Sequence, residues 1–312
     1  MPLSNTNSRI LLQAAKSLGI TAQIINYPNE KIKLTKGQKS HIVHKKGINL
    51  NLHSAIILTR NKAKTLDLLR HHGLPIPKIY DLKSNISFPL VVKPISGQKG
   101  QHVYLNIQNQ NQLDTALTHI SGPVLTQQFI PGHDLRFLIL AGKVIGIVNR
   151  RLPRITGDGH STIKQLLNQE NTRRVKLTQK IGRRMLNRLR HWPRINWYLK
   201  LQSLTLNSIL PKAKTIAVYP LANFSTGASA HALAKNQIHP SLIRLAEQTV
   251  KLTRLKVAGV DMIVKDWTKP ATPNNAYIIE INSDPSLRLH DWPNTGHPQH
   301  VAQKLLTYIF SS

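Results

Sequence analysis

Two apolar segments near the C-terminal end of the chain contain polar residues that buried strands seldom carry. The segments VAGVDMIV (residues 257–264) and YIIEIN (277–282) have the length and apolar content of buried strands. The first contains Asp261, and the second is interrupted by Glu280 and Asn282. Because strand side chains alternate between faces, Glu280 and Asn282 project to the same side, and their oxygens are hard ligands that suit Mg²⁺. These three residues are therefore candidate metal ligands. The alternative is that the two acids form ordinary ion pairs in a sheet.

The remaining hydrophobic pattern predicts helices interspersed with strands and hairpins, with no internal repeat. Asn61 is the expected N-cap of one helix, which Gly73 ends. The helices are expected near residues 9–18, 61–72, 111–119, 241–254 and 300–310, and the further strands near 22–27, 88–94, 103–107 and 123–130, with a hairpin turn at 141–143. Mixed antiparallel hairpins and helices indicate an α+β protein rather than one doubly wound sheet.

Residues 171–200 form a basic segment with ten Lys and Arg residues and no acid. Leu177, Ile181, Met185 and Leu189 recur every four residues, which predicts a basic amphipathic helix. One interpretation is a solvated helix that packs its apolar stripe on the body of the protein. The other is a docking surface for an anionic macromolecule or an anionic membrane surface.

The overall composition points to anionic partners. The chain has 43 Lys and Arg residues against 13 Asp and Glu residues, a formal net charge of +30 over 312 residues. The absence of cysteine excludes disulfides, thiolate metal sites and a cysteine nucleophile. The first residues lack the pattern of a secretory signal, and no apolar run is long enough to span a bilayer. We therefore expect a cytoplasmic protein.

Four features are together consistent with ATP binding. Lys93 ends an apolar strand and Lys62 lies at a helix start, so both could reach phosphate oxygens. The turn SGQKG (96–100) could present backbone N–H groups to phosphates, and QQFIPGHD (127–134) supplies an apolar strand edge followed by an acid for ribose hydroxyls. The candidate metal ligands would hold the Mg²⁺ that bridges the phosphates. No GxxxxGK[ST] motif occurs, which excludes a P-loop.

The order of these motifs resembles the ATP-grasp family, and within it the amide-ligase domain of cyanophycin synthetases and the C-terminal domain of bifunctional glutathione synthetases. The motifs are NKAKTLDLLRHHGLPIP (61–77), FPLVVKP (88–94), QQFIPGHDLRFLILAGKVIG (127–146), RITGDGHSTI (154–163), NFSTGASA (223–230), VAGVDMIV (257–264) and YIIEINSDPSLRLH (277–290). The resemblance implies an ATP-grasp fold with two α/β lobes that clasp ATP (residues 59–312), preceded by a small N-terminal α/β region (1–58).

The resemblance also implies roles for individual residues, with ATP and Mg²⁺, or Mn²⁺ in its place, as cofactors. The phosphates would contact Lys62, Lys93 and the loop residues Ser96, Gly97 and Gly100, while adenine would contact Gln127, Gln128 and Ile130 and ribose would contact Asp134. The metal would bind Asp261, Glu280 and Asn282. Arg136 and Arg288 would hold the acyl phosphate or acceptor carboxylates. The implied reaction transfers the γ-phosphoryl group to a carboxylate, and an amine then displaces phosphate to form an amide. The expected substrates are amino acids or short peptides, and we expect a homo-oligomer.

Several departures from the family pattern leave the substrates open. Gln127 replaces the usual Glu, the phosphate loop has fewer glycines, and Pro285-Ser286 replaces the usual Pro-Gly. Cyanophycin synthetases carry a second, P-loop module that this sequence lacks, so we do not expect the complete two-activity polymerase. Two alternatives remain: a ligase that modifies a macromolecular acceptor docked by the basic segment, and a non-catalytic nucleotide-binding protein.

Overall fold

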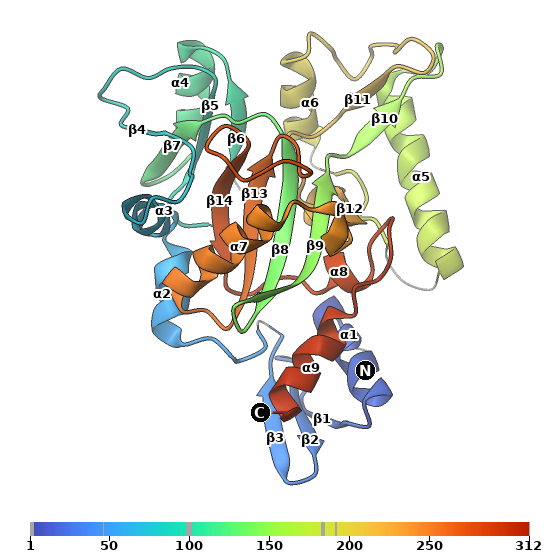
Figure 1. Ribbon diagram of the computed structural model, residues 1–312. Coiled ribbons are helices and arrows are strands. Elements are labelled where there is room, and N and C mark those ends of the chain that lie inside the picture. Colours follow the sequence, from blue (N-terminus) through green and yellow to red (C-terminus); the bar gives the residue numbers. More distant parts are fainter. Residues whose placement is uncertain (1–2, 46, 98–101, 182–184, 191, 312) are drawn as a thin grey trace. The chain divides into compact units, whose positions relative to one another are not determined.

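The computed structural model describes residues 3–45, 47–97, 102–181, 185–190 and 192–311 (Figure 1). The chain forms two compact units. The first unit contains residues 1–77, 130–149 and 232–312, and the second contains residues 78–129 and 150–231. The boundary that the sequence predicts at residue 58 stays a prediction.

Four neighbouring strands of a five-stranded sheet form the centre of the first unit. The strand order of this sheet is β12-β9-β8-β13-β14, formed by β12 (Ser229–Ala232), β9 (Lys143–Arg151), β8 (His133–Leu140), β13 (Val257–Val264) and β14 (Ala276–Asn282). β13 pairs antiparallel with both β8 and β14. Nearly every residue of β8 and β13 is buried, as expected for strands that are apolar on both faces. The two apolar strands in which the sequence analysis found polar residues, β13 and β14, are therefore neighbours.

Three helices pack against this sheet. α7 (Pro240–Thr253) contacts β8 and β13, while α2 (His53–Arg60) and α3 (Lys62–His71) contact β14. The side chain of Asn61 accepts a hydrogen bond from the backbone N–H of Lys64 at 3.0 Å, which confirms the predicted N-cap. This cap fixes Lys62 in the first turn of α3.

The first unit also contains a small three-stranded sheet, of which the sequence pattern predicted only the first strand. α1 (Thr6–Ser17) leads into β1 (Thr21–Asn26), β2 (Lys31–Lys36) and β3 (Lys39–Val43), which pair in the order β1-β2-β3. Lysines are frequent in β2 and make the strand difficult to recognise in the sequence, but Ile32 and Leu34 between them are fully buried. They share a core with α1 and with α9 (Val301–Ser311).

The second unit contains a four-stranded sheet with the order β4-β7-β5-β6. Its strands are β4 (Ile79–Tyr80), β7 (Val124–Gln128), β5 (Leu90–Pro94) and β6 (Tyr104–Ile107), and α4 (Gln110–Thr118) packs on β5 and β6. The predicted strands near 88–94 and 103–107 pair antiparallel as β5 and β6. The rest of the unit contains β10 (Arg154–Thr156), β11 (Thr215–Ala217), α5 (Ile163–Ile181) and α6 (Trp192–Lys200).

The prediction of one continuous helix through the basic segment is wrong. α5 ends at Ile181 and α6 begins at Trp192, while residues 185–190 are not helical. The reason is that polar side chains of α5 bind this connection in a folded-back conformation. Asn171 accepts a hydrogen bond from the Leu189 N–H at 2.7 Å and donates one to the Leu189 carbonyl at 3.0 Å. Met185 and Leu189 are buried as predicted, but from a loop rather than from a helix face.

No helix within the described ranges combines the length and the apolar content needed to cross a bilayer.

Candidate functional site

Arg136, Asp261 and Glu280 form a row across three neighbouring strands of the first unit. In the register of the sheet, Asp261 of β13 lies opposite Arg136 of β8 on one side and opposite Glu280 of β14 on the other. Directly opposed residues of an antiparallel pair project to the same face and lie close enough to interact. We call Arg136, Asp261 and Glu280 the charged row. The sheet therefore brings together two of the three predicted metal ligands and one of the two predicted substrate-binding arginines.

Arg136 and Asp261 form a buried bidentate ion pair. The Arg136 Nε atom donates to Asp261 Oδ1 at 2.6 Å, and Nη2 donates to Oδ2 at 2.6 Å. The two residues are 8% and 5% exposed. The fork-to-fork geometry is the strongest arrangement for this kind of pair. The ion-pair alternative for the strand acids thus holds at Asp261.

Gly259 provides room for the Arg136 side chain. A Cβ atom at this position would lie 3.4 Å from Arg136 Nε and 3.2 Å from Pro285 Cβ. Sequence reasoning did not assign Gly259 a role. The available signal was a glycine in the interior of a strand, two residues before Asp261, because such a glycine often marks a close approach of another group.

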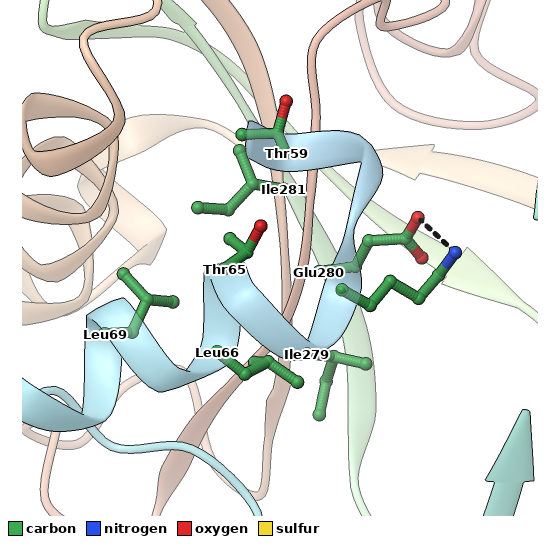
Figure 2. Close-up of a pocket in the computed structure, with 8 residues that line it drawn as sticks. Thr59, Thr65, Leu66, Leu69, Ile279, Glu280 and Ile281 are labelled. Carbon is green, nitrogen blue, oxygen red and sulfur yellow. Dashed lines mark ion pairs between the residues drawn. The ribbon is translucent and has the colours of Figure 1, made fainter. Parts of the chain in front are cut away.

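Lys62 is the second cation beside the charged row. Its Nζ atom lies 3.8 Å from Glu280 Oε1, and the dashed line in Figure 2 marks this ion pair. The Lys62 side chain is 9% exposed, whereas that of Glu280 is 38% exposed. Both residues line a small pocket, whose other lining residues are Thr59, Thr65, Leu66, Leu69, Ile279 and Ile281. A buried cation thus faces a carboxylate that is partly open to solvent.

Asn282 lies on the same face of β14 as Glu280. It is opposite Gly259 in the register, and its Oδ1 atom accepts a hydrogen bond from the Asp284 N–H at 2.9 Å. Among the residues that the structure describes, no group of three or more His, Asp or Glu side chains is placed to hold a metal ion. A metal at this place would therefore bind two carboxylates and the Asn282 amide oxygen, all hard oxygen donors of the kind that Mg²⁺ takes.

The other predicted residues of the first unit lie close to this sheet. Asp134 precedes Arg136 by two positions on β8 and is opposite Ile263 of β13. Arg288 begins α8 (Arg288–Asp291) and is 7% exposed, and Ile130 is 8% exposed. The structure thus places Asp134 on the same face of β8 as Arg136, and it buries most of Arg288.

A hydrogen-bonded cluster behind α8 was not predicted from the sequence. The Gln299 side chain accepts from the Ile147 N–H at 3.0 Å and donates to the Ile147 and Leu233 carbonyls at 2.9 Å each. Its Oε1 atom lies 2.9 Å from Nδ1 of His290, which is fully buried in α8. Gln299 therefore fixes α8, and with it Arg288, to β9. No motif pointed to Gln299.

The second unit carries the predicted nucleotide contacts of β5 and β7. Lys93 is 4% exposed and Gln127 is 2% exposed, and the register places both on one face of the sheet. Within the described ranges, the Gln127 Nε2 atom has no hydrogen-bond partner. A buried donor left unpaired costs about 1–3 kcal/mol, so a ligand with a polar edge would suit this position.

The remaining predicted nucleotide contacts lie at or near the surface of the second unit. Gln128 at the end of β7 is half-buried, and the loop residues Ser96 and Gly97 are exposed. Gly100, the third predicted loop residue, lies outside the described residues.

Comparisons with known proteins agree with the motif order. An ATP-grasp domain family matches residues 59–165. The cyanophycin synthetase of Synechocystis sp. is 30% identical over 298 residues, which is 88% of this chain and 33% of that protein. The glutathione biosynthesis bifunctional protein of Clostridium perfringens is 27% identical over 323 residues, 98% of this chain and 41% of that protein. The chain thus spans between a third and two fifths of the length of these relatives.

A solved structure shows the same fold. The bifunctional glutathione synthetase from Pasteurella multocida superimposes with a TM-score of 0.69 at 22% sequence identity, covering 98% of this chain and 44% of that one. Helices and antiparallel strands combine in both units, as predicted for an α+β protein. The chain therefore has the ATP-grasp fold.

Proposed function

We propose that this chain is an ATP-dependent, ADP-forming carboxylate–amine ligase. The observation that carries the proposal is the charged row with Lys62 beside it. Arg136, Asp261 and Glu280 share one sheet face, and Lys62 of α3 lies beside them. All of these charged groups except Glu280 are buried, and burying charge is expensive unless a ligand or partner compensates. Phosphoryl transfer depends mainly on such positioning and charge neutralisation, and it needs no covalent nucleophile.

The proposed reaction has two steps. A carboxylate oxygen of the first substrate attacks the γ-phosphorus of ATP, and ADP leaves. An amine of the second substrate then attacks the acyl carbon, loses a proton and expels phosphate, so that an amide bond forms. Lys62 and Lys93 would hold phosphate oxygens as point charges. Arg136 and Arg288 would hold the acyl phosphate or an acceptor carboxylate through bidentate contacts.

The residues of the first unit fit a bound Mg²⁺ ion, with Mn²⁺ as the alternative. Asp261, Glu280 and Asn282 project from one sheet face and offer three oxygen donors. A divalent ion there would neutralise phosphate charge during transfer. The Arg136 guanidinium orients the Asp261 carboxylate by binding both of its oxygens. Gln127, Gln128, Ile130 and Asp134 would bind adenine and ribose.

For the substrates we propose an amino acid or short peptide as carboxylate donor and another as amine acceptor. The similarity to proteins named cyanophycin synthetase and glutathione biosynthesis bifunctional protein supports this class. The chain would act in the cytoplasm as a homo-oligomer. The basic segment 171–200 remains the proposed docking place for an anionic macromolecule or membrane surface, although Glu170 already pairs with Arg173 and Arg174 at 2.6 and 2.7 Å.

The test combines nucleotide binding with turnover. Calorimetric titration of ATP with and without Mg²⁺ measures binding, and an ADP-release assay with pairs of amino acids and dipeptides measures ligation. Glu280→Gln keeps the shape of the side chain but removes its charge, so turnover should fall by about two orders of magnitude or more. Asp67→Asn, which changes an exposed acid of α3, is the matched control and should keep wild-type turnover. ADP release by Glu280→Gln at the wild-type rate would refute the assignment of Glu280.

A further inference from the structure

An open groove in the first unit lies outside the charged row and its neighbours. It has a volume of about 550 Å³ and is bounded by α7, by the hairpin turn between β8 and β9, and by the start of α2. That volume lies within the range of ligand-binding clefts. Its lining residues are Leu52, Ala141, Gly142, Lys143, Arg244, Glu247, Gln248, Val250, Lys251, Arg254, Leu255 and Lys256. No residue assigned to nucleotide, metal or substrate is among them.

The groove is strongly cationic. Glu247 is the single acid among the described residues that line the groove. Its carboxylate already has partners, because Oε2 lies 3.4 Å from Lys143 Nζ and Oε1 accepts a hydrogen bond from the Val144 N–H at 3.1 Å. The other four cations are Arg244, Lys251, Arg254 and Lys256, all exposed. Within the described parts of the chain none of these four has an ion-pair partner. Four positive charges therefore converge on one groove without internal compensation.

The spacing of the cations fits a linear anion rather than a single small one. Arg244 and Lys251 lie seven residues apart on α7, and Arg254 follows where the helix ends. At a rise of 1.5 Å per residue, the three positions extend over about 15 Å. One phosphate or carboxylate group cannot reach all of them. An extended peptide of about four or five residues covers this distance, with side chains on one edge repeating every ~7 Å.

The residue types that line the groove favour a peptide over a nucleic acid as the linear anion. Its uncharged lining comprises Leu52, Val250 and Leu255, two small residues and the Gln248 amide, and none of the described lining residues is aromatic. Single-stranded nucleic acid is usually bound with aromatic side chains on which bases stack. Gln248 can instead donate to and accept from a peptide backbone. A second copy of this chain is a poor occupant of this groove, because its 13 acidic residues are scattered along the sequence and no segment of it is rich in Asp and Glu.

We propose that this groove binds an extended acidic peptide, a segment of a partner protein rich in Asp and Glu. About three carboxylates on one edge of the peptide would be shared among Arg244, Lys251, Arg254 and Lys256. Leu52, whose side chain is 63% exposed, would cover apolar parts of the peptide at the rim. Peptide binding here is independent of ATP and of the proposed ligase reaction.

The experiment is a fluorescence anisotropy titration of the full chain with a fluorescein-labelled octaglutamate peptide at low salt. The groove variant carries Arg244→Gln, Lys251→Gln, Arg254→Gln and Lys256→Gln. The matched control carries Lys16→Gln, Lys33→Gln, Lys36→Gln and Lys265→Gln, which remove the same charge from exposed positions elsewhere in the first unit. Thermal unfolding of each protein shows that the variants are folded.

We expect the groove variant to bind octaglutamate at least about tenfold more weakly than wild type, and the control variant to bind within about twofold. Octaglutamine should not bind. Glu280→Gln should bind as wild type does, and this result would hold even if the ligase proposal failed. Binding should weaken steadily as salt is raised, because exposed charges are screened.

Three results would overturn the proposal. Equal weakening in both fourfold variants would mean that the peptide responds only to the net charge of the protein. Binding of octauridylate RNA or phosphatidylserine vesicles that is tighter than that of octaglutamate, and lost in the groove variant, would assign the groove to nucleic acid or to a membrane. No binding of octaglutamate by wild type at 20 mM salt or so would remove the peptide as an occupant, since screening is weak at that ionic strength.

Discussion

Replacing Arg136 by Met tests the electrostatics of the charged row most directly. The substitution keeps most of the volume of the side chain but leaves the Asp261 carboxylate, 5% exposed, without the two hydrogen bonds of 2.6 Å that satisfy it. Removing one partner of a buried ion pair costs about 3–5 kcal/mol, because the other charge stays buried and uncompensated. Replacing both partners by apolar residues of similar size is often close to neutral.

The structure offers a control with the same chemistry and different burial. Arg70 and Asp67 also approach to 2.6 Å, but their side chains are 63% and 52% exposed. An exposed pair contributes at most about 1 kcal/mol. For a unit of 150–250 residues, each 1 kcal/mol corresponds to about 2–4 °C in the unfolding midpoint. Arg136→Met should therefore lower the midpoint by roughly 6–20 °C, and Arg70→Met should lower it by less than about 4 °C.

The assay is thermal unfolding followed by circular dichroism on four proteins. These are wild type, Arg136→Met, the double variant Arg136→Met/Asp261→Leu, and Arg70→Met. We expect the double variant to recover most of the stability that Arg136→Met loses. If Arg136→Met unfolds within 2 °C or so of wild type, or if the double variant is no more stable than the single one, the pair is not the buried, mutually dependent ion pair described above.

Three further predictions concern packing and pH. Gly146→Ala should destabilise the chain by about 1–3 kcal/mol in urea unfolding, because its Cβ would lie 2.7 Å from Gln299 Oε1. Asn171→Ala should remove the two hydrogen bonds to Leu189, and limited proteolysis should then cleave residues 185–190 faster than in wild type. Burial acts to raise the pKa of Glu170, but hydrogen bonds from the neighbouring arginines outweigh it, so the pKa lies below its ordinary value of 4.5. The stability that Glu170 adds relative to Glu170→Gln should thus be complete above pH 4.5 and disappear as the pH falls through the lowered pKa, which unfolding curves between pH 3 and 7 would detect.

The elements that the sequence predicted well are those whose hydrophobic period agrees with their capping residues. The helix at Asn61 is an example, because the N-cap and the closing Gly73 both agree with the apolar pattern. β13 and β14 were predictable because their apolar runs are short and continuous. β2 was missed because lysines fill its exposed positions. The helix through residues 171–200 was predicted wrongly because a period of four also fits a helix followed by a loop whose apolar residues are buried.

The sequence singled out the residues of the charged row, but it did not show which of them lie opposite one another. Asp261 and Glu280 stood out because acids interrupt apolar strands, and a sequence pattern of this kind carries that information. The contact between Arg136 and Asp261 depends on the register of the sheet. These residues are 125 positions apart in the sequence, and only the alignment of β8 with β13 places them opposite each other. The contributions of Gly259 and Gln299 also depend on which groups approach them, and this information is absent from local sequence.

The charge balance of the row gives a physical reason for its acids. Arg136 brings one positive charge and Lys62 of α3, beside the row, brings a second, while Asp261 and Glu280 bring two negative ones, so this region is close to neutral. A site built only to bind phosphate would gain from cations alone, and a chain with 43 basic and 13 acidic residues has cations in abundance. Ion pairing for stability is a weak alternative reason, because buried ion pairs rarely stabilise a fold more than apolar packing does. We propose instead that these acids serve a divalent cation that accompanies the anionic substrate. Nucleotide binding should then depend on both acids together with that cation, and removing one charge at Glu280 should weaken Mg²⁺-dependent ATP binding while leaving the Arg136–Asp261 pair intact.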